Sequence, residues 1–168
     1  MPVKNDRKLF EFLVLESAQA GLSWRTVLYK REGYRKAFAD FDPKKVAKFR
    51  SREVKKLLVN SAIIRNRLKI LATINNAEKF LEIQKEFGTF SKYMWGFVGD
   101  KSIDGKRRSL RGLPALTREA EVFAKDLKER GFKFLGPTII YAHMQAVGMV
   151  NDHITGCFRY REIKRKNL

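Results

Sequence analysis

The sequence predicts an all-α protein folded as a single domain. Apolar residues recur at spacings of three and four along most of the chain, and no segment alternates apolar and polar residues long enough to require a sheet. A length of 168 residues suffices for one sizeable core, and the 44% hydrophobic content excludes disorder for most of it. We expect one domain over residues 1–168, with two lobes flanking a groove and a basic tail from about residue 159.

The first helix is expected between Asn5 and Gly21, and it organises the rest of the chain. Asn5 or Asp6 caps its start, and Gly21 supplies the left-handed residue with which many helices end. Apolar residues cover nearly its whole circumference, so we expect a central, buried helix. These residues are Phe10, Phe12, Leu13, Val14 and Leu15.

One acidic residue interrupts this apolar helix. Glu16 shares a helical face with Phe12 and Leu13, and a carboxylate there is costly unless it is paired, protonated or used. Ser23 can cap a second helix that begins at Trp24, so a tight corner can bring the indole and the carboxylate to one pocket. Spacing alone favours an ordinary core glutamate satisfied by a backbone amide. A pocket for a flat, nitrogen-rich ligand is the alternative.

Capping residues and prolines mark the remaining helices, with Asp42, Ser51 and Thr117 among the caps. Residues 99–114 are polar, glycine-bearing and basic, which is typical of an exposed loop, and the basic tail is expected to fray. The helices are expected over residues 24–38, 43–49, 51–60, 63–83, 90–98, 117–131 and 137–148.

The charge of the chain is strongly unbalanced. Lys and Arg number 36 against 18 Asp and Glu, which gives a net charge of +18. This favours polyanions, of which nucleic acid is the commonest, although an anionic membrane or an acidic protein would satisfy the same charge. A single cysteine excludes an intrachain disulfide, no apolar run reaches the length of a membrane span, and no signal-peptide pattern opens the chain. These features predict a soluble, cytoplasmic protein.

Several segments together resemble one enzyme family, the bacterial 3-methyladenine DNA glycosylases of type I. They follow in the family's order and cover nearly the whole chain: LFEFLVLESAQAGLSW, YRKAFADFDPKKVA, AIIRNRLKI, RGFKFLGPTIIYAHMQAVGMVNDH and GC. The resemblance implies an all-α helix-hairpin-helix glycosylase. Such an enzyme hydrolyses the N-glycosidic bond of flipped-out 3-methyladenine in alkylated double-stranded DNA, and we expect it to act as a monomer.

The resemblance also gives roles to the first corner. Glu16 matches the family's pocket glutamate, the catalytic candidate, and Trp24 matches the tryptophan that stacks on the base. Leu22, beside Gly21, matches the residue that wedges into the duplex. N3-methylation leaves adenine cationic, and a cation over an indole face gains about 1–2 kcal/mol when desolvated. Recognition of the base would explain why Glu16 is buried. The sequence does not decide whether Glu16 acts as an acid, as a base or only as a binding group.

A helix-hairpin-helix is implied at LLVNSAIIRNRLKI. Its hairpin residues are Ser61, Ala62, Ile63 and Ile64, and Arg65 begins the next helix. Backbone amides and nearby cations would grip DNA phosphates there. Ala62 stands where the family commonly has glycine, so it incurs a steric cost if the position needs a positive φ. The alternative is an ordinary helix–helix turn with surface arginines.

His153 and Cys157 are four residues apart, a spacing that lets both reach one Zn²⁺. The family completes this pair with a cysteine and a histidine from an N-terminal leader, and it also draws pocket walls from that leader. We interpret the leader as missing here, since the other histidine, His143, lies in a late helix. Two ligands make only half a zinc site, so we interpret them as vestigial and expect no required cofactor. Without the walls that the leader supplies, the base pocket would be open on one side, which could impair activity.

Two functions from different classes remain open. The first is an active monofunctional glycosylase, and the second is a non-catalytic helix-hairpin-helix module that recognises damaged DNA. Both predict salt-dependent binding to DNA, but only the first predicts release of free base. A binder of RNA or another polyanion would show no dependence on Glu16.

Overall fold

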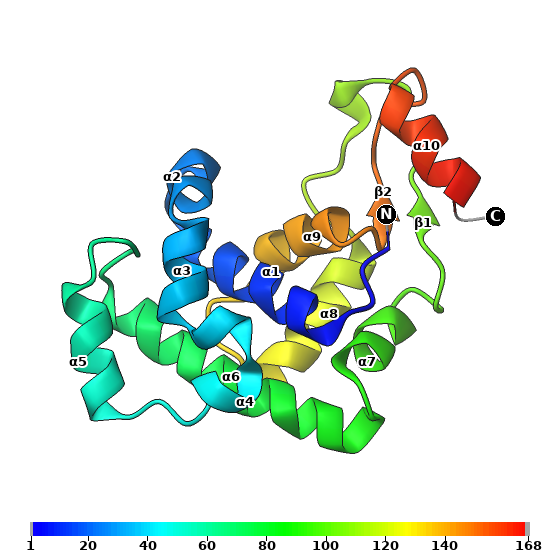
Figure 1. Cartoon of the computed structure of the whole chain (residues 1–168). Coiled ribbons are helices and arrows are strands. Elements are labelled where there is room, and N and C mark those ends of the chain that lie inside the picture. Colours follow the sequence, from blue (N-terminus) through cyan, green and yellow to red (C-terminus); the bar gives the residue numbers. More distant parts are fainter. Residues whose placement is uncertain (1, 167–168) are drawn as a thin grey trace.

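The computed structural model describes residues 2–166 and confirms an all-α fold (Figure 1). Two short 3₁₀ turns, η1 (Ala39–Phe41) and η2 (Leu110–Gly112), and two strands, β1 (Ile103–Asp104) and β2 (Val150–Asn151), accompany the helices. The helices are α1 (Asp6–Gln19), α2 (Trp24–Tyr29), α3 (Arg31–Ala37), α4 (Pro43–Val46), α5 (Ser51–Val59), α6 (Arg67–Phe87), α7 (Phe90–Gly96), α8 (Arg118–Glu129), α9 (Pro137–Ala146) and α10 (Phe158–Lys166).

Helix α1 lies at the centre of the fold, as the sequence predicts. Asn5 caps its start, and Gly21 has a φ of +74° just beyond its end. Asp6 caps a different helix, because its carboxylate accepts the first amides of α7 at 2.8 and 2.9 Å. The start of α1 is thereby tied to α7, which lies more than eighty residues further along the chain.

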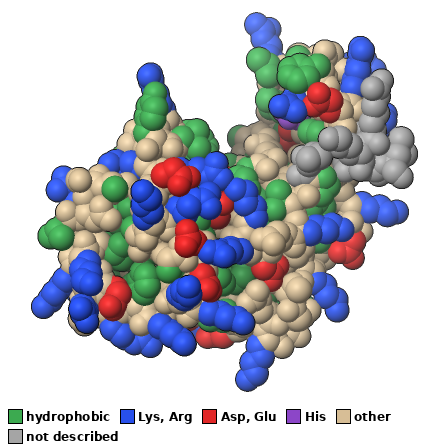
Figure 2. Space-filling view, in the orientation of Figure 1, with side chains coloured by type: hydrophobic (Ala, Val, Ile, Leu, Met, Phe, Trp, Pro, Cys, Tyr) green, Lys and Arg blue, Asp and Glu red, His purple; other side chains and the backbone are tan. Residues whose placement is uncertain are grey.

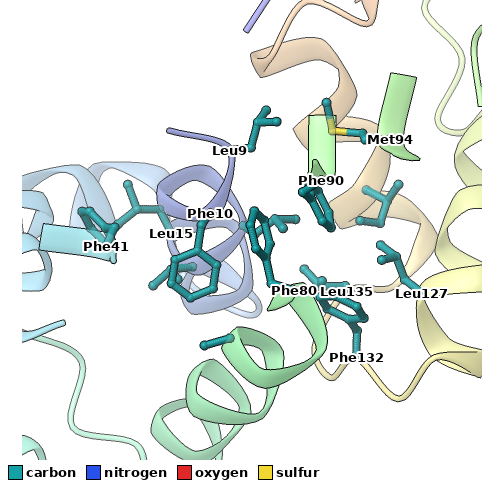
Figure 3. Close-up of a cluster of buried hydrophobic side chains, with 14 of the residues drawn as sticks. Leu9, Phe10, Leu15, Phe41, Phe80, Phe90, Met94, Leu127, Phe132 and Leu135 are labelled. Carbon is teal, nitrogen blue, oxygen red and sulfur yellow. The ribbon is translucent and has the colours of Figure 1, made fainter. Parts of the chain in front are cut away.

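One hydrophobic core surrounds α1 (Figure 3). Phe10 of α1 meets Phe80 of α6 edge-on, with 5.3 Å between the ring centroids, and Phe80 stacks on Phe90 of α7 at 4.2 Å. Each fully buried aromatic ring of this kind stabilises the fold by about 1.5–3 kcal/mol. Helix α1 also packs against α9, so it is held between α6 and α7 on one side and α9 on the other.

Several helix boundaries differ from the sequence prediction, and three of the differences affect the region around the hairpin. The helix expected over residues 24–38 is broken at Lys30 into α2 and α3, and the break allows Gly33 of α3 to lie against the hairpin before α6. Helix α5 is capped at Arg50 rather than at Ser51, because the Arg50 amide donates to the Glu53 side chain. Helix α6 begins two residues later than Arg65.

The C-terminal region is more ordered than the sequence indicates. Strands β1 and β2 form a short parallel pair that ties the loop over residues 99–114 to the segment after α9. The described part of the basic tail forms α10 instead of fraying, and the Tyr160 hydroxyl anchors it by donating to Asp104 at 2.9 Å. No helix in the described part of the chain combines the length and apolar character that a membrane crossing needs.

The surface carries lysine and arginine side chains over the whole face shown in Figure 2, with acidic side chains among them. This face is hollowed between α2 and the segment that carries α10. In the same view, α1 and α9 lie beneath the hollow.

Candidate functional site

Glu16 is buried in α1 without a hydrogen-bond partner among the described residues. Its side chain is 1% exposed, and neither carboxylate oxygen is hydrogen-bonded. Burial in apolar surroundings raises its pKa to about 8. The ordinary explanation, a core glutamate satisfied by a backbone amide, is therefore not what the structure shows. Unpaired buried groups of this kind are rare in native proteins, and a ligand is one physical reason to keep one.

Glu11, on the same helix, has the opposite environment. It is 4% exposed, and its carboxylate lies 2.7 Å from Arg31 Nε and 2.8 Å from Lys8 Nζ. Burial alone would raise its pKa, but the hydrogen bonds and charges of Arg31 and Lys8 outweigh burial and hold the pKa below its usual value. Glu11 is therefore an ionised, paired carboxylate.

The turn after α1 presents Leu22 to solvent. Gly21 gives the turn its positive φ, and Leu22 is 39% exposed. Lys69 of α6 fixes the turn, since its ammonium donates to the carbonyl oxygens of Ala18 at 2.8 Å and Ala20 at 2.6 Å. Lys69 thus caps the C-terminus of α1, where cations are favoured. An apolar side chain held outward on a fixed turn suits a wedge, and this role stays a prediction.

Trp24 begins α2 directly after its cap. Ser23 accepts a hydrogen bond from the Thr26 amide, as the sequence predicts. The indole of Trp24 is half-buried and packs against the core, which leaves part of it accessible. Helices α1 and α2 pack against each other, so Trp24 and Glu16 lie on adjacent helices. Stacking of the indole on a bound base stays a prediction.

The segment between α5 and α6 forms a hairpin, but its central amides are already occupied. The exposed residues Ser61 and Arg65 and the first amides of α6 stay accessible, and phosphate binding at this hairpin stays a prediction. The occupied amides are those of Ala62, which donates to Asn60 Oδ1 at 2.9 Å, Ile63, which donates to Asn60 O at 3.4 Å, and Ile64, which donates to Tyr34 Oη at 3.3 Å.

Ala62 does not incur the steric cost considered for it, because its φ is not positive. Helix α3 supports the hairpin at this point. A Cβ on Gly33 would lie only 2.1 Å from the carbonyl oxygen of Ala62, and Lys30 Nζ donates to the Ser61 carbonyl at 2.6 Å. Glycine is therefore needed in α3, opposite the hairpin.

His153 and Cys157 lie close together, with 4.0 Å between Nδ1 and Sγ. They line a cavity of about 790 Å³ whose lining does not include Glu16 or Trp24. A structural zinc site needs four donors, and the described chain shows no group of three or more His, Cys, Asp or Glu side chains able to hold a metal. The residues present thus supply half of a site, and the expectation that no cofactor is required stays a prediction.

His143 received no role from the sequence, and the structure makes it a candidate. Its ring is fully buried, both nitrogens lack partners among the described residues, and burial lowers its pKa to about 3. The ring meets Phe12 of α1 edge-on at 6.4 Å. The sequence feature that could have identified His143 is its position inside the apolar run TIIYAHMQA, where a histidine is unusual.

Comparisons with known proteins match this chain to methyladenine glycosylases over nearly its whole length. The family model described as methyladenine glycosylase matches residues 1–160. The DNA-3-methyladenine glycosylase 1 of Escherichia coli is 44% identical over 160 residues, which are 95% of this chain and 86% of that protein.

Two solved structures are also similar. A crystal structure of 3-methyladenine DNA glycosylase I is 48% identical, with a TM-score of 0.90 over 94% of this chain and 87% of that one. The Staphylococcus aureus 3-methyladenine DNA glycosylase I, solved to explain its recognition of 3-methyladenine, is 37% identical. Its TM-score is 0.91 over 94% of this chain and 84% of that one.

Proposed function

The chain belongs to the methyladenine glycosylase family, and we propose that it hydrolyses the N-glycosidic bond of 3-methyladenine in alkylated DNA. The reaction is that of a monofunctional DNA N-glycosylase, which begins base excision repair. The observation that carries the proposal is the buried, unpartnered carboxyl group of Glu16, in the segment on which the family resemblance depends. An enzyme that acts on a base must first take it out of the stack. The flipped base would supply the hydrogen-bond partner that the Glu16 carboxyl group lacks.

Glu16 selects the alkylated base through charge. A base methylated at N3 is cationic in DNA, and a nearby positive charge lowers the pKa of a buried carboxyl group. Entry of the cationic base therefore ionises Glu16, which then accepts hydrogen bonds from the exocyclic amine. A neutral purine in the duplex does not offset the cost of a buried negative charge, so it gains none of this stabilisation when it is extruded. The indole of Trp24 adds attraction between its face and the cation.

The chemical step needs little assistance once the base is held. The bond between the sugar C1′ and the base N9 breaks, and its electron pair neutralises the cationic ring, which leaves as free 3-methyladenine. A water molecule adds to C1′ and releases a proton to solvent. The protein contributes orientation of the nucleotide and electrostatic stabilisation by Glu16.

The remaining site residues bind the DNA around the lesion. Leu22 fills the space that the extruded nucleotide leaves in the duplex. Ser61, Arg65 and the start of α6 contact phosphates, and the net charge of +18 gives a salt-dependent affinity. The proposal includes action as a monomer on double-stranded DNA in the cytoplasm, and the single cysteine supports a reducing compartment.

Chromatography of free bases released from methylated duplex DNA tests this function. We expect the parent chain to release 3-methyladenine and Glu16→Gln to release it at least about a hundredfold more slowly, the scale of losing one preorganised electrostatic group. Glu11→Gln, a buried glutamate of the same helix, is the matched control and should keep its release rate when folded. Absence of release by the parent chain, with DNA binding intact, would refute the glycosylase and leave a DNA-binding module.

A further inference from the structure

Few buried side-chain polar atoms lack hydrogen-bond partners in the described chain. They belong to Glu16, His143 and Asn151. Leaving such an atom unpaired costs about 1–3 kcal/mol, so each case calls for an explanation. His143 is the most extreme, because its side chain is 0% exposed and both of its ring nitrogens lack partners.

The position of His143 connects it to Glu16. Helix α9 packs against α1, and the imidazole meets the ring of Phe12 at 6.4 Å with 73° between the planes. Phe12 lies four residues before Glu16, which places the two side chains on one face of α1, about 6 Å apart along the helix axis. The imidazole and the carboxyl group therefore border the same part of the interface between α1 and α9.

The two groups offer complementary hydrogen bonding. Once it is ionised, Glu16 can accept hydrogen bonds but not donate them, so it pairs with N–H groups of the base such as the exocyclic amine and leaves a ring nitrogen that is an acceptor without a donor. Burial keeps the imidazole of His143 neutral at neutral pH, and a neutral imidazole has one N–H donor and one acceptor nitrogen. A neutral ring does not repel a cationic base. The edge of an adenine carries an amine beside a ring nitrogen, which is a donor beside an acceptor.

We propose that His143 is a specificity-determining residue of the base site, whose imidazole N–H donates to a ring nitrogen of the bound base while Glu16 accepts from the amine. This inference rests on the proposed function, because it needs an adenine-type base at Glu16. A base without this donor–acceptor pair would leave one of the two buried groups unpaired, and the site would discriminate against it.

The substitution His143→Phe separates this role from packing. Phenylalanine keeps a planar ring against Phe12 but removes both nitrogens. We expect the variant to be at least as stable as the parent chain, because two unpaired polar atoms disappear. Its affinity for free 3-methyladenine, measured by calorimetric titration, should be about tenfold lower, the value of one lost hydrogen bond of about 1.4 kcal/mol.

Imidazole ¹⁵N spectra of the labelled parent chain give a second, independent readout. The chain has two histidines, so the resonances missing from His143→Phe belong to His143, and those of the exposed His153 serve as an internal control. Free 3-methyladenine should shift the His143 resonances and leave those of His153 in place.

The outcomes distinguish this inference from the proposed function. Unchanged His143 resonances together with full affinity in His143→Phe, while the parent chain binds 3-methyladenine, would make His143 a core histidine and overturn the inference alone. If His143→Phe does not fold, the ¹⁵N spectra of the parent chain decide by themselves. Failure of the parent chain both to bind and to release 3-methyladenine would overturn the proposed function and this inference with it.

Discussion

Helix α1 carries two buried glutamates whose surroundings differ completely. At its first half, Glu11 is covered by cations from α1 and α3, with Arg31 Nε at 2.7 Å, Lys8 Nζ at 2.8 Å and Arg35 Nη2 at 3.5 Å. At its second half, Glu16 is equally buried but has no hydrogen-bond partner in the described chain. The pKa of Glu11 is held below its usual value, whereas that of Glu16 is raised to about 8.

The difference shows that burial alone does not identify a functional carboxyl group. Both residues are less than 5% exposed, so what separates them is the presence or absence of a cation on the neighbouring helix. A paired carboxylate adds to stability and is already satisfied. An unpaired carboxyl group lowers stability but is free to interact with a ligand. This is the pattern expected of a site that binds a cation.

The largest expected effect is on the pH dependence of stability. The folded chain keeps a proton on Glu16 up to about pH 8, whereas the unfolded chain loses it near the ordinary value of 4.5. The contribution of Glu16 to stability is therefore most favourable below pH 4.5 and falls as pH rises toward 8, by up to roughly 5 kcal/mol at about 1.4 kcal/mol per pH unit. Glu16→Gln should lack this loss, so its advantage over the parent chain grows between pH 5 and pH 8.5.

Guanidinium denaturation at pH 5, 6.5 and 8.5 measures this advantage. Glu11→Gln provides the control, because the lowered pKa of Glu11 gives stability that is present above its ordinary value and disappears as pH falls through the lowered one. Equal pH slopes for the parent chain and Glu16→Gln would show that Glu16 is ionised in the folded state.

The next effect concerns Glu11→Gln at neutral pH. Removing one partner of a buried ion pair costs about 3–5 kcal/mol, but Arg31 and Lys8 are each 38% exposed, so we expect about 2 kcal/mol. The denaturation midpoint measures the loss. Base release by the folded variant should stay at the parental rate. A variant as stable as the parent chain, or one that folds but is inactive, would remove the distinction between the two glutamates.

A smaller effect is expected for Lys69→Met, which removes the cap on α1 and keeps an unbranched side chain. Without the two hydrogen bonds to Ala18 and Ala20, the turn that holds Leu22 loosens, and base release should fall about tenfold. A fluorescent base analogue next to the lesion should report slower extrusion of the nucleotide. Lys85→Met, an exposed lysine near the other end of α6, controls for the lost charge. Normal extrusion in Lys69→Met would refute the positioning role.

The smallest effect is expected for Ala62→Gly in the hairpin. Because the φ of Ala62 is not positive, glycine should not stabilise the chain and should cost less than about 1 kcal/mol through its greater freedom when unfolded. Affinity for undamaged DNA, measured by titration at fixed salt, should be unchanged. A clear gain in stability would mean that Ala62 is strained after all.

The sequence could predict α1, its caps and the burial of Glu16, because these depend on residues within one helix. It could not predict that Glu11 would be paired and Glu16 unpaired. Arg31 reaches Glu11 from twenty positions away, and whether Glu16 finds a partner depends on how the other helices pack around α1. The burial of His143 against α1 could not be predicted for the same reason, since its contact with Phe12 spans 131 positions.

The hairpin illustrates the same limit. Its existence and position follow from the local sequence, whereas the occupation of the Ile64 amide requires Tyr34, thirty residues earlier. The break at Lys30 and the helix α10 also depend on distant contacts, with the hairpin and with β1 respectively. The local sequence pattern thus predicts the helices and the hairpin. Contacts between distant residues determine which polar groups are left without hydrogen-bond partners.

Measuring the protonation state of Glu16 shows directly whether this carboxyl group is unpaired in the folded chain. Carbon-detected NMR of the labelled chain follows each glutamate side-chain carboxyl group through a pH titration, and the resonance missing from Glu16→Gln identifies Glu16. We expect it to titrate near pH 8, well above Glu11, and to shift when free 3-methyladenine is added. Titration of Glu16 below about pH 5, in the ordinary range for glutamate, would contradict the claim that this carboxyl group is unpaired and kept for the base.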